Sequence, residues 1–148
     1  MPKAKKLKLL SFCFRLLPIN MKTQTSFAPV LRIRNGVTDL DFYKNAFGAA
    51  EHFRITNDDG TVHVAEFDID GAVFHIHEIY PHTQDFDSKA HTGVVTVGLF
   101  TDDVHSVFDS AIAAGARAVM PVTDFEYGYR QGELVDPFGH KWIIEKKL

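Results

Sequence analysis

The sequence predicts an α+β domain made of two consecutive β-α-β-β-β modules, and three observations support this prediction. Short segments alternate apolar residues with other residues, as half-buried strands do. Two longer segments space their apolar residues at helical intervals, and a glycine follows each. The order of strands and helices is the same in both halves of the chain, so a unit of roughly 50 to 60 residues is repeated.

The first module is expected over residues 27–79. The segment FAPVLRIRN, residues 27–35, alternates in the manner of a strand. GVTDLDFYKNAFGA, residues 36–49, has helical spacing, with Thr38 placed to cap its start and Gly48 to end it. DDG and DG turns separate three further strands, which are expected over residues 51–57, 61–69 and 72–79.

The second module, residues 93–146, repeats this order. Its helix is expected within DDVHSVFDSAIAAGA, with Asp102 or Asp103 as the N-terminal cap and Gly115 at the end. DPFG forms the last turn, and PVTDFEYGYRQ is expected as a loop. Strands are expected over residues 94–101, 117–122, 128–136 and 140–147.

The rest of the chain is expected to lie outside the modules. Residues 80–92 are polar and without strand or helix periodicity, so they are expected to link the modules within a single domain over residues 22–148. Residues 1–21 are expected to be a leader or disordered tail, because Met21 begins MKTQTSF directly before the first strand. A signal peptide or membrane anchor, or an additional packed element, are alternatives for this basic and partly apolar segment.

Composition limits the partners and the compartment. The formal net charge of -3 provides no general attraction to a phosphate backbone, so no nucleic-acid partner is expected. The apolar run near the N-terminus is too short to span a bilayer, so no membrane partner is expected. Cys13 is the only cysteine, which fits a reducing compartment, and a cytoplasmic location is expected.

Aligning the modules on Gly71 and Gly139 places His75 on Ile143. Alternate residues of a strand share a face, so Phe74 and Ile76 should pack against the helix, whereas His75 and His77 should line the uncovered, concave side. A two-residue turn at Asp70 and Gly71 sets Glu66 opposite His75. These side chains are therefore expected to form a site on the concave face.

These segments together resemble the vicinal oxygen chelate superfamily, the glyoxalase, bleomycin-resistance and extradiol dioxygenase group. LRIRNGVTDLDFYKNAFGAAE is similar to the first-module signature of its PhnB-like branch, and GELVDPFGHKWII is similar to its closing hairpin. The resemblance covers residues 27–146. It implies the glyoxalase/bleomycin resistance-like fold, in which two modules form a cupped mixed sheet around a small-molecule cavity, and a homodimer.

The resemblance also implies where a metal would bind. Active members hold a divalent metal at four positions, which fall here at about Ala28, His75, Thr96 and Ile143. Only His75 is a strong ligand, since alanine and isoleucine have no donor atom and a neutral hydroxyl is a weak one. The family metal site is therefore expected to be lost, with no metal and no other cofactor; His75 and His77, with Glu66, are weak candidates for a remodelled site.

Two classes of function remain open. The leading hypothesis is a protein that binds a small organic molecule in the cup, with Arg32 pairing with a carboxylate or phosphate. The alternative is a lyase, isomerase or dioxygenase-type enzyme, with Glu66, His75 and His77 as catalytic candidates. A structural or regulatory module would instead fill the cup with its own aromatic side chains. The complete set of expected ligand-binding residues is Arg32, Glu66, His75, His77, Thr96, Tyr127, Tyr129, Arg130 and Ile143.

Overall fold

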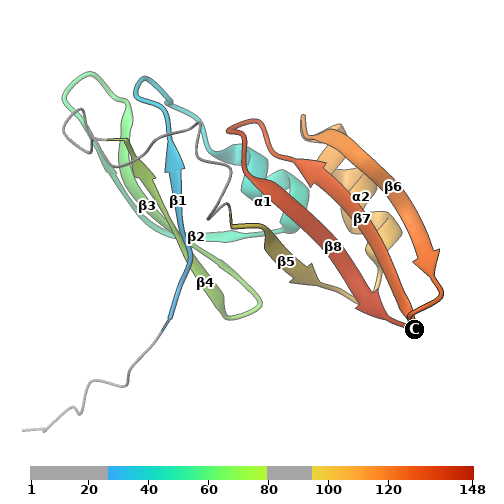
Figure 1. Ribbon diagram of the computed structural model, residues 1–148. Helices are drawn as coiled ribbons and strands as arrows, with labels where there is room; N and C mark the ends of the chain where they lie inside the picture. The colour runs from blue at the N-terminus through green and yellow to red at the C-terminus, as the bar shows by residue number, and fades with distance from the viewer. Residues whose placement is uncertain (1–26, 80–94) are drawn as a thin grey trace, which may run out of the picture.

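The computed structural model describes residues 27–79 and 95–148. Two four-stranded sheets and two helices make up this part of the chain, in the order β-α-β-β-β twice. Figure 1 shows one sheet on the left and the other on the right, with α1 between them. The predicted α+β class and the repeated module are confirmed. The expected leader, residues 1–21, and the whole of the expected linker, residues 80–92, lie outside the described residues.

The first module contains one short helix and a mixed sheet. Its strands lie in the order β1-β4-β3-β2, with β1 parallel to β4 and the other pairs antiparallel. Among the strands that the structure describes, β1 lies at the edge of this sheet and has β4 as its one neighbour. The elements are β1 (Val30–Ile33), α1 (Asp41–Phe47), β2 (Ala50–Thr56), β3 (Val62–Ile69) and β4 (Ala72–Glu78).

The second module repeats this topology, with the strand order β5-β8-β7-β6 and a parallel pair of β5 and β8. Its elements are β5 (Val97–Phe100), α2 (Val104–Ala113), β6 (Arg117–Phe125), β7 (Tyr129–Val135) and β8 (Lys141–Lys147). The predicted alignment of the modules holds in the registers, because Val30 lies beside His75 in one sheet and Gly98 lies beside Ile143 in the other.

The helix ends show where the sequence prediction was right and where it was wrong. Thr38 does not cap α1: the helix begins at Asp41, whose backbone N–H donates to the Asp39 carboxylate at 2.7 Å. The end at Gly48 is confirmed, since this residue has a left-handed φ of 65°. For α2, Asp103 is the cap, and its side chain accepts a hydrogen bond from the backbone N–H of Ser106.

The expected loop PVTDFEYGYRQ is instead the end of a β-hairpin. β6 continues to Phe125, and β7 begins at Tyr129, directly opposite Phe125. Gly128 makes the turn possible with a positive φ of 86°, which residues with a side chain rarely adopt. The segment therefore carries strand pairing that its polar and aromatic composition did not indicate.

The core joins the two modules through aromatic side chains. Tyr43 of α1 is fully buried, and its ring lies 5.3 Å from that of Phe74 in the first sheet. Phe47, one turn further on, packs 4.6 Å from the ring of Trp142 in the second sheet. Contacts of this kind contribute about 0.5–1.5 kcal/mol beyond burial itself. Among the described residues, no helix has the length and hydrophobicity to cross a membrane.

Candidate functional site

The first sheet has one face covered by α1 and one open face. The rings of Phe67 and Phe74 lie 5.5 and 5.3 Å from Tyr43, so this side of the sheet faces the helix. Residues between them on the strands point the other way. The open face carries Val30, Arg32, His52, Phe53, Ile55, Val64, Glu66, His75 and His77.

Glu66 lies at the centre of the open face. It is paired with His75 as the sequence predicted, with 3.6 Å between the carboxylate Oε2 and the imidazole Nε2. The other carboxylate oxygen, Oε1, lies 3.2 Å from Nδ1 of His52. One carboxylate is thus shared between two imidazoles, an arrangement that can orient both rings.

His52 was missed in the sequence because it sits in a β-bulge. The β2–β3 register passes from Glu51 opposite Phe67 to Phe53 opposite Glu66, which leaves His52 without a partner residue of its own. A bulge places two consecutive residues against one residue of the next strand, so simple alternation assigns the side chain to the wrong face.

Arg32 and His77 form the second polar pair of the open face. The parallel register of β1 and β4 places them side by side. Burial lowers the pKa of the His77 imidazole, and the positive charges of Arg32 and His75 lower it further. His77 is therefore held largely neutral near neutral pH beside a permanent cation. The pair presents one fixed and one pH-dependent positive charge, which suits an anionic group on a ligand.

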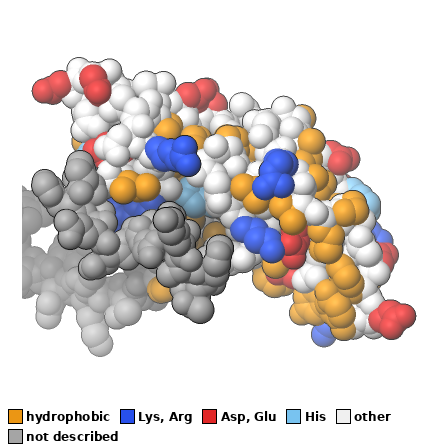
Figure 2. All heavy atoms as spheres, turned by 45° about the horizontal axis from the view of Figure 1, so that its top comes forward, with side chains coloured by type: hydrophobic (Ala, Val, Ile, Leu, Met, Phe, Trp, Pro, Cys, Tyr) orange, Lys and Arg blue, Asp and Glu red, His pale blue; other side chains and the backbone are white. Residues whose placement is uncertain are grey.

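Exposed apolar side chains surround these polar groups. Val30, Phe53 and Ile55 are 48%, 42% and 53% exposed, which is unusual for hydrophobic residues that share one sheet face. Figure 2 shows hydrophobic and basic side chains interspersed on one side of the molecule. The open face thus combines apolar area with a few polar groups, as small-molecule sites do.

The open face of the second sheet carries a different set. Gly98, Ile143 and Glu133 follow one another across three strands, and Phe100 lies beside Glu145 at 67% exposure. Ile143 was expected at the site, and this register places it at the position equivalent to that of His75. It supplies only an apolar surface.

Hydrogen bonds link part of this second face to the end of the β6–β7 hairpin. The Tyr127 hydroxyl donates to Oε1 of Gln131 at 2.5 Å, and the Gln131 amide donates to Oε2 of Glu145 at 2.6 Å. The expected cluster of aromatic side chains forms, since the rings of Tyr127 and Tyr129 lie 6.1 Å apart. Aromatic rings and a carboxylate therefore lie on the second face.

Three other predicted residues lie apart from these groups. Arg130 belongs to the alternate positions of β7 that include the buried Leu134, and it is bound to Asp124, with Nη2 and Oδ2 2.8 Å apart. It therefore points away from the open face and does not join the tyrosines. Ala28 and Thr96 precede β1 and β5, and Thr96 is exposed.

Behind the two faces, the DPFGH turn forms a buried polar network. The Asp136 carboxylate is 4% exposed and accepts hydrogen bonds from the Tyr43 hydroxyl and the Trp142 indole, each at 3.1 Å. The backbone N–H groups of Phe138 and His140 and the His140 ring also donate to it. Burial raises the pKa of Asp136, but the hydrogen bond and charge of His140 outweigh burial and hold it below its usual value.

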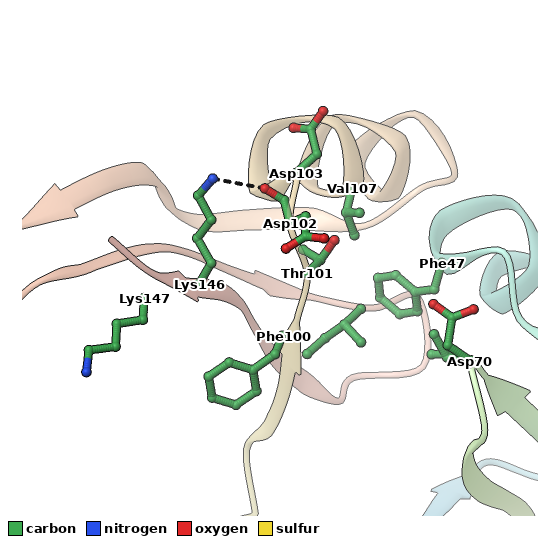
Figure 3. Close-up of a pocket in the computed structure, with 11 residues that line it drawn as sticks. Phe47, Asp70, Phe100, Thr101, Asp102, Asp103, Val107, Lys146 and Lys147 are labelled. Atoms are coloured by element: carbon green, nitrogen blue, oxygen red, sulfur yellow. Dashed lines mark hydrogen bonds between the residues drawn. The ribbon is translucent and has the colours of Figure 1, made fainter.

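A separate hollow of about 780 Å³ lies between the modules. Phe47, Leu99 and Val107 supply apolar walls, and the Lys146 ammonium donates to the backbone carbonyl of Asp102 at 2.9 Å. Figure 3 shows these side chains spread around the hollow rather than pointing to one position. Phe100 lines the hollow as well, but the histidines of the first open face do not reach it.

The residues do not fit a metal centre. Of the candidates His75, His77 and Glu66, the two imidazole rings are 6.3 Å apart, and the carboxylate is already divided between His52 and His75. Within residues 27–79 and 95–148, no three His, Cys, Asp or Glu side chains are grouped as metal ligands.

Two β-α-β-β-β modules with uncovered sheet faces match the glyoxalase/bleomycin resistance fold. The chain belongs to the glyoxalase/bleomycin resistance protein/dioxygenase superfamily, whose family model matches residues 31–144. An uncharacterized protein of Mycobacterium bovis is 31% identical over 128 residues, which cover 84% of each chain.

Solved structures share the fold. A gene product of Arabidopsis thaliana is 29% identical with a TM-score of 0.65, and covers 83% of this chain and 99% of its own. TioX from Micromonospora sp. ML1 is 25% identical with a TM-score of 0.62, over 83% of this chain and all of TioX. A bleomycin-binding protein complexed with bleomycin has a TM-score of 0.58 at 16% identity, over 84% of this chain and 100% of its own, which is a likeness of fold alone.

Proposed function

We propose that this protein binds a small organic anion in a cup formed by its open sheet faces, without a metal. Ligands of this class carry an apolar body and a carboxylate or phosphate group. Apolar side chains of the open face would bury the body, while Arg32 and His77 would bind the anion. A protein that shares only the fold, the bleomycin-binding protein, was solved in complex with bleomycin.

One observation carries the proposal: a fixed cation stands beside a histidine among exposed apolar side chains. Arg32 lies next to His77, and Val30 lies next to His75 on the same two strands. A guanidinium can bind a carboxylate or phosphate in a bidentate manner, and exposed apolar area around it removes water from the contact. A solvated strand would more often carry polar residues at the positions of Val30 and Phe53.

A homodimer is part of the proposal, because a partner subunit would cover the apolar side chains that each open face leaves exposed to solvent. The first face carries Arg32 together with the Glu66 carboxylate, and on the second face the Glu133 carboxylate pairs with the Lys141 ammonium at 2.7 Å. Exposed apolar side chains on both faces, Val30 and Phe53 on the first and Phe100 on the second, suit a two-fold arrangement in which the partner covers them. We further propose that the chain belongs to the PhnB-like branch, which the DPFGH.W motif supports. We also propose a cytoplasmic location, which the single cysteine supports.

Association is tested by sedimentation of the wild-type chain and of Phe100→Asp. A charge in the centre of an apolar contact is expected to convert the dimer to a monomer. Ile112→Asp is the matched control, since Ile112 is also a partly exposed hydrophobic residue but lies on α2. Monomeric wild-type protein, or equal dissociation of both variants, would refute the proposed arrangement.

Ligand binding is tested by a thermal-shift screen of aromatic and aliphatic carboxylates and phosphate monoesters. A ligand of the proposed class is expected to raise the melting temperature of the wild-type protein. Arg32→Gln should weaken its binding by about tenfold or more, which corresponds to the loss of a charge-assisted hydrogen bond of ~1.5–3 kcal/mol. Arg34→Gln should leave the binding affinity unchanged, since Arg34 is exposed and lies just beyond the end of β1. Binding that survives Arg32→Gln would contradict the proposed site.

A second candidate function is metal-free proton transfer, and the shared carboxylate favours it. Glu66 contacts both His52 and His75, so it can orient an imidazole that removes or returns a proton next to a carbonyl group. Elemental analysis of protein purified without chelator, followed by lyase and isomerase assays, separates the alternatives. Stoichiometric metal that disappears in both His75→Ala and His77→Ala would overturn the metal-free proposal in either form.

A further inference from the structure

His140 of the second module is bound on both sides by groups that can only accept hydrogen bonds. Its Nδ1 lies 2.9 Å from Oδ2 of Asp136, and its Nε2 lies 2.8 Å from the backbone carbonyl oxygen of Arg32. A neutral imidazole has a single N–H and can donate to only one of them. Both contacts are satisfied only when the ring is an imidazolium.

The neighbouring groups favour this charge. The Tyr43 hydroxyl donates to the same Asp136 carboxylate and lies 3.5 Å from Nδ1 of His140, and burial together with Asp136 raises the pKa of this phenol, so it remains protonated. The Arg34 side chain, the other charged group near the turn, lines a small hollow with residues 137–139. Burial lowers the pKa of His140, but the hydrogen bond and charge of Asp136 outweigh burial and raise it above its usual value.

The carbonyl that His140 binds belongs to the edge strand of the first module. The carbonyls of Pro29 and Ile33 accept hydrogen bonds from the β4 side, from the N–H groups of His75 and Ile79. Carbonyls alternate in direction along a strand, so the Arg32 carbonyl points to the outer edge of β1, where no strand of residues 27–79 or 95–148 pairs with it. His140 supplies the donor there.

We propose that His140 is a positioning residue: as an imidazolium held by Asp136, it fastens the outer edge of β1 and thereby places the Arg32 side chain beside His77 on the open face. The role of Arg32 in ligand binding rests on the proposed function. The placement of the Arg32 side chain by His140 does not depend on that function. The closing turn of one module thus sets the geometry of the anion site on the other.

Two variants separate the contacts of His140. His140→Asn retains a donor near the position of Nδ1 but cannot reach the Arg32 carbonyl, whereas His140→Gln can extend a donor toward it. Gly132→Ala is the control for lost stability, because it strains the second module at Phe108 without touching the turn. The readouts are the pKa of His77, measured by NMR titration, and amide hydrogen exchange in β1.

His140→Asn is expected to raise the pKa of His77, because the displaced guanidinium of Arg32 no longer opposes its protonation, and to speed exchange in β1 by about tenfold or more. His140→Gln should change the pKa of His77 and the exchange rate in β1 less than His140→Asn does. Gly132→Ala should leave the pKa of His77 unchanged. A folded His140→Asn variant with an unchanged pKa of His77 and unchanged exchange in β1 would overturn the proposal.

A measurement on the wild-type chain keeps the test independent of folding. Ring nitrogen shifts should show both nitrogens of His140 protonated at pH 7.5, and a neutral ring would overturn the proposal. Inorganic phosphate, titrated against the wild-type chain, tests the proposed function separately. Phosphate can fail to bind while the pKa of His77 still responds to His140→Asn and His140→Gln as expected. That result would refute the proposed anion binding and leave the positioning role of His140 in place.

Discussion

Phe108 of α2 packs so closely against Gly132 of β7 that a Cβ atom on the glycine would lie 2.7 Å from a ring carbon of the phenylalanine. Real Cβ atoms essentially never approach that closely, so Gly132→Ala must displace the buried ring or the helix. We expect a loss of about 1–3 kcal/mol in the free energy of unfolding, which is the usual effect of overpacking. Urea denaturation of the two proteins measures it.

A double-mutant cycle tests the stated cause. In a Phe108→Ala background the ring is absent, so adding Gly132→Ala should cost much less than it does in the wild-type protein. An equal loss in both backgrounds would attribute the effect to Val122, whose side chain would also lie 3.0 Å from the added methyl group.

Substitution of the buried Asp136 carboxylate is expected to lower the free energy of unfolding strongly. Asp136→Asn puts an amide where Tyr43, Trp142 and His140 all donate, and leaves the imidazolium of His140 without its counter-charge. We expect a loss of about 3–5 kcal/mol, typical of a buried ion pair broken on one side. Tyr43→Phe removes only one of the donors and should cost about 1 kcal/mol. Comparable losses in both variants would contradict this ranking.

The same pair predicts how stability depends on pH. The folded pKa of His140 is raised above 6.5, so its contribution is fully present below 6.5 and is lost as the pH rises through the folded value. The folded pKa of Asp136 is lowered below 3.8, so its contribution is present above 3.8 and is lost as the pH falls through the folded value. Melting temperatures of the wild-type protein and of Asp136→Asn should be measured from below pH 3.8 to above pH 6.5. The difference between the two proteins should be largest at pH values between the folded pKa of Asp136 and the folded pKa of His140.

Most of the fold could be predicted from the sequence because local patterns and the repeat agree. The Asp70–Gly71 turn fixes the pairing of Glu66 with His75, and the repeat gives the equivalent pairing of Glu133 with Ile143. The start of α1 could not be predicted as well. Thr38 is a better intrinsic cap than Leu40, but the chain remains non-helical until Asp41, and the buried Leu40 occupies the cap position.

The site was predictable only where strands alternate regularly. Glu66, His75 and His77 could be placed on one face from spacing alone, whereas the bulge at His52 breaks the alternation that such reasoning uses. Arg130 was grouped with the tyrosines by proximity in the sequence, but strand pairing turns it toward Asp124. The contact of His140 with Arg32 joins residues 108 positions apart, and no local pattern indicates it.

The charge of Arg32 is expected to control the protonation of His77. Burial lowers the pKa of His77, and Arg32 is the next largest influence, so removing this cation makes the imidazolium easier to form. Arg32→Gln should therefore raise the pKa of His77, whereas Arg34→Gln, on an exposed side chain two residues further along, should leave it unchanged. NMR titration of the histidine ring protons measures both values.

This coupling also gives anion binding a direction with pH. Protonated His77 adds a second positive charge beside Arg32, so phosphate and carboxylate ligands should bind more tightly as the pH falls through the lowered pKa of His77, and above it only Arg32 should contribute. In His77→Gln the gain at low pH should disappear while binding at higher pH is retained. An anion affinity that does not change with pH in wild-type protein, or changes equally in His77→Gln, would show that His77 does not contact the bound anion.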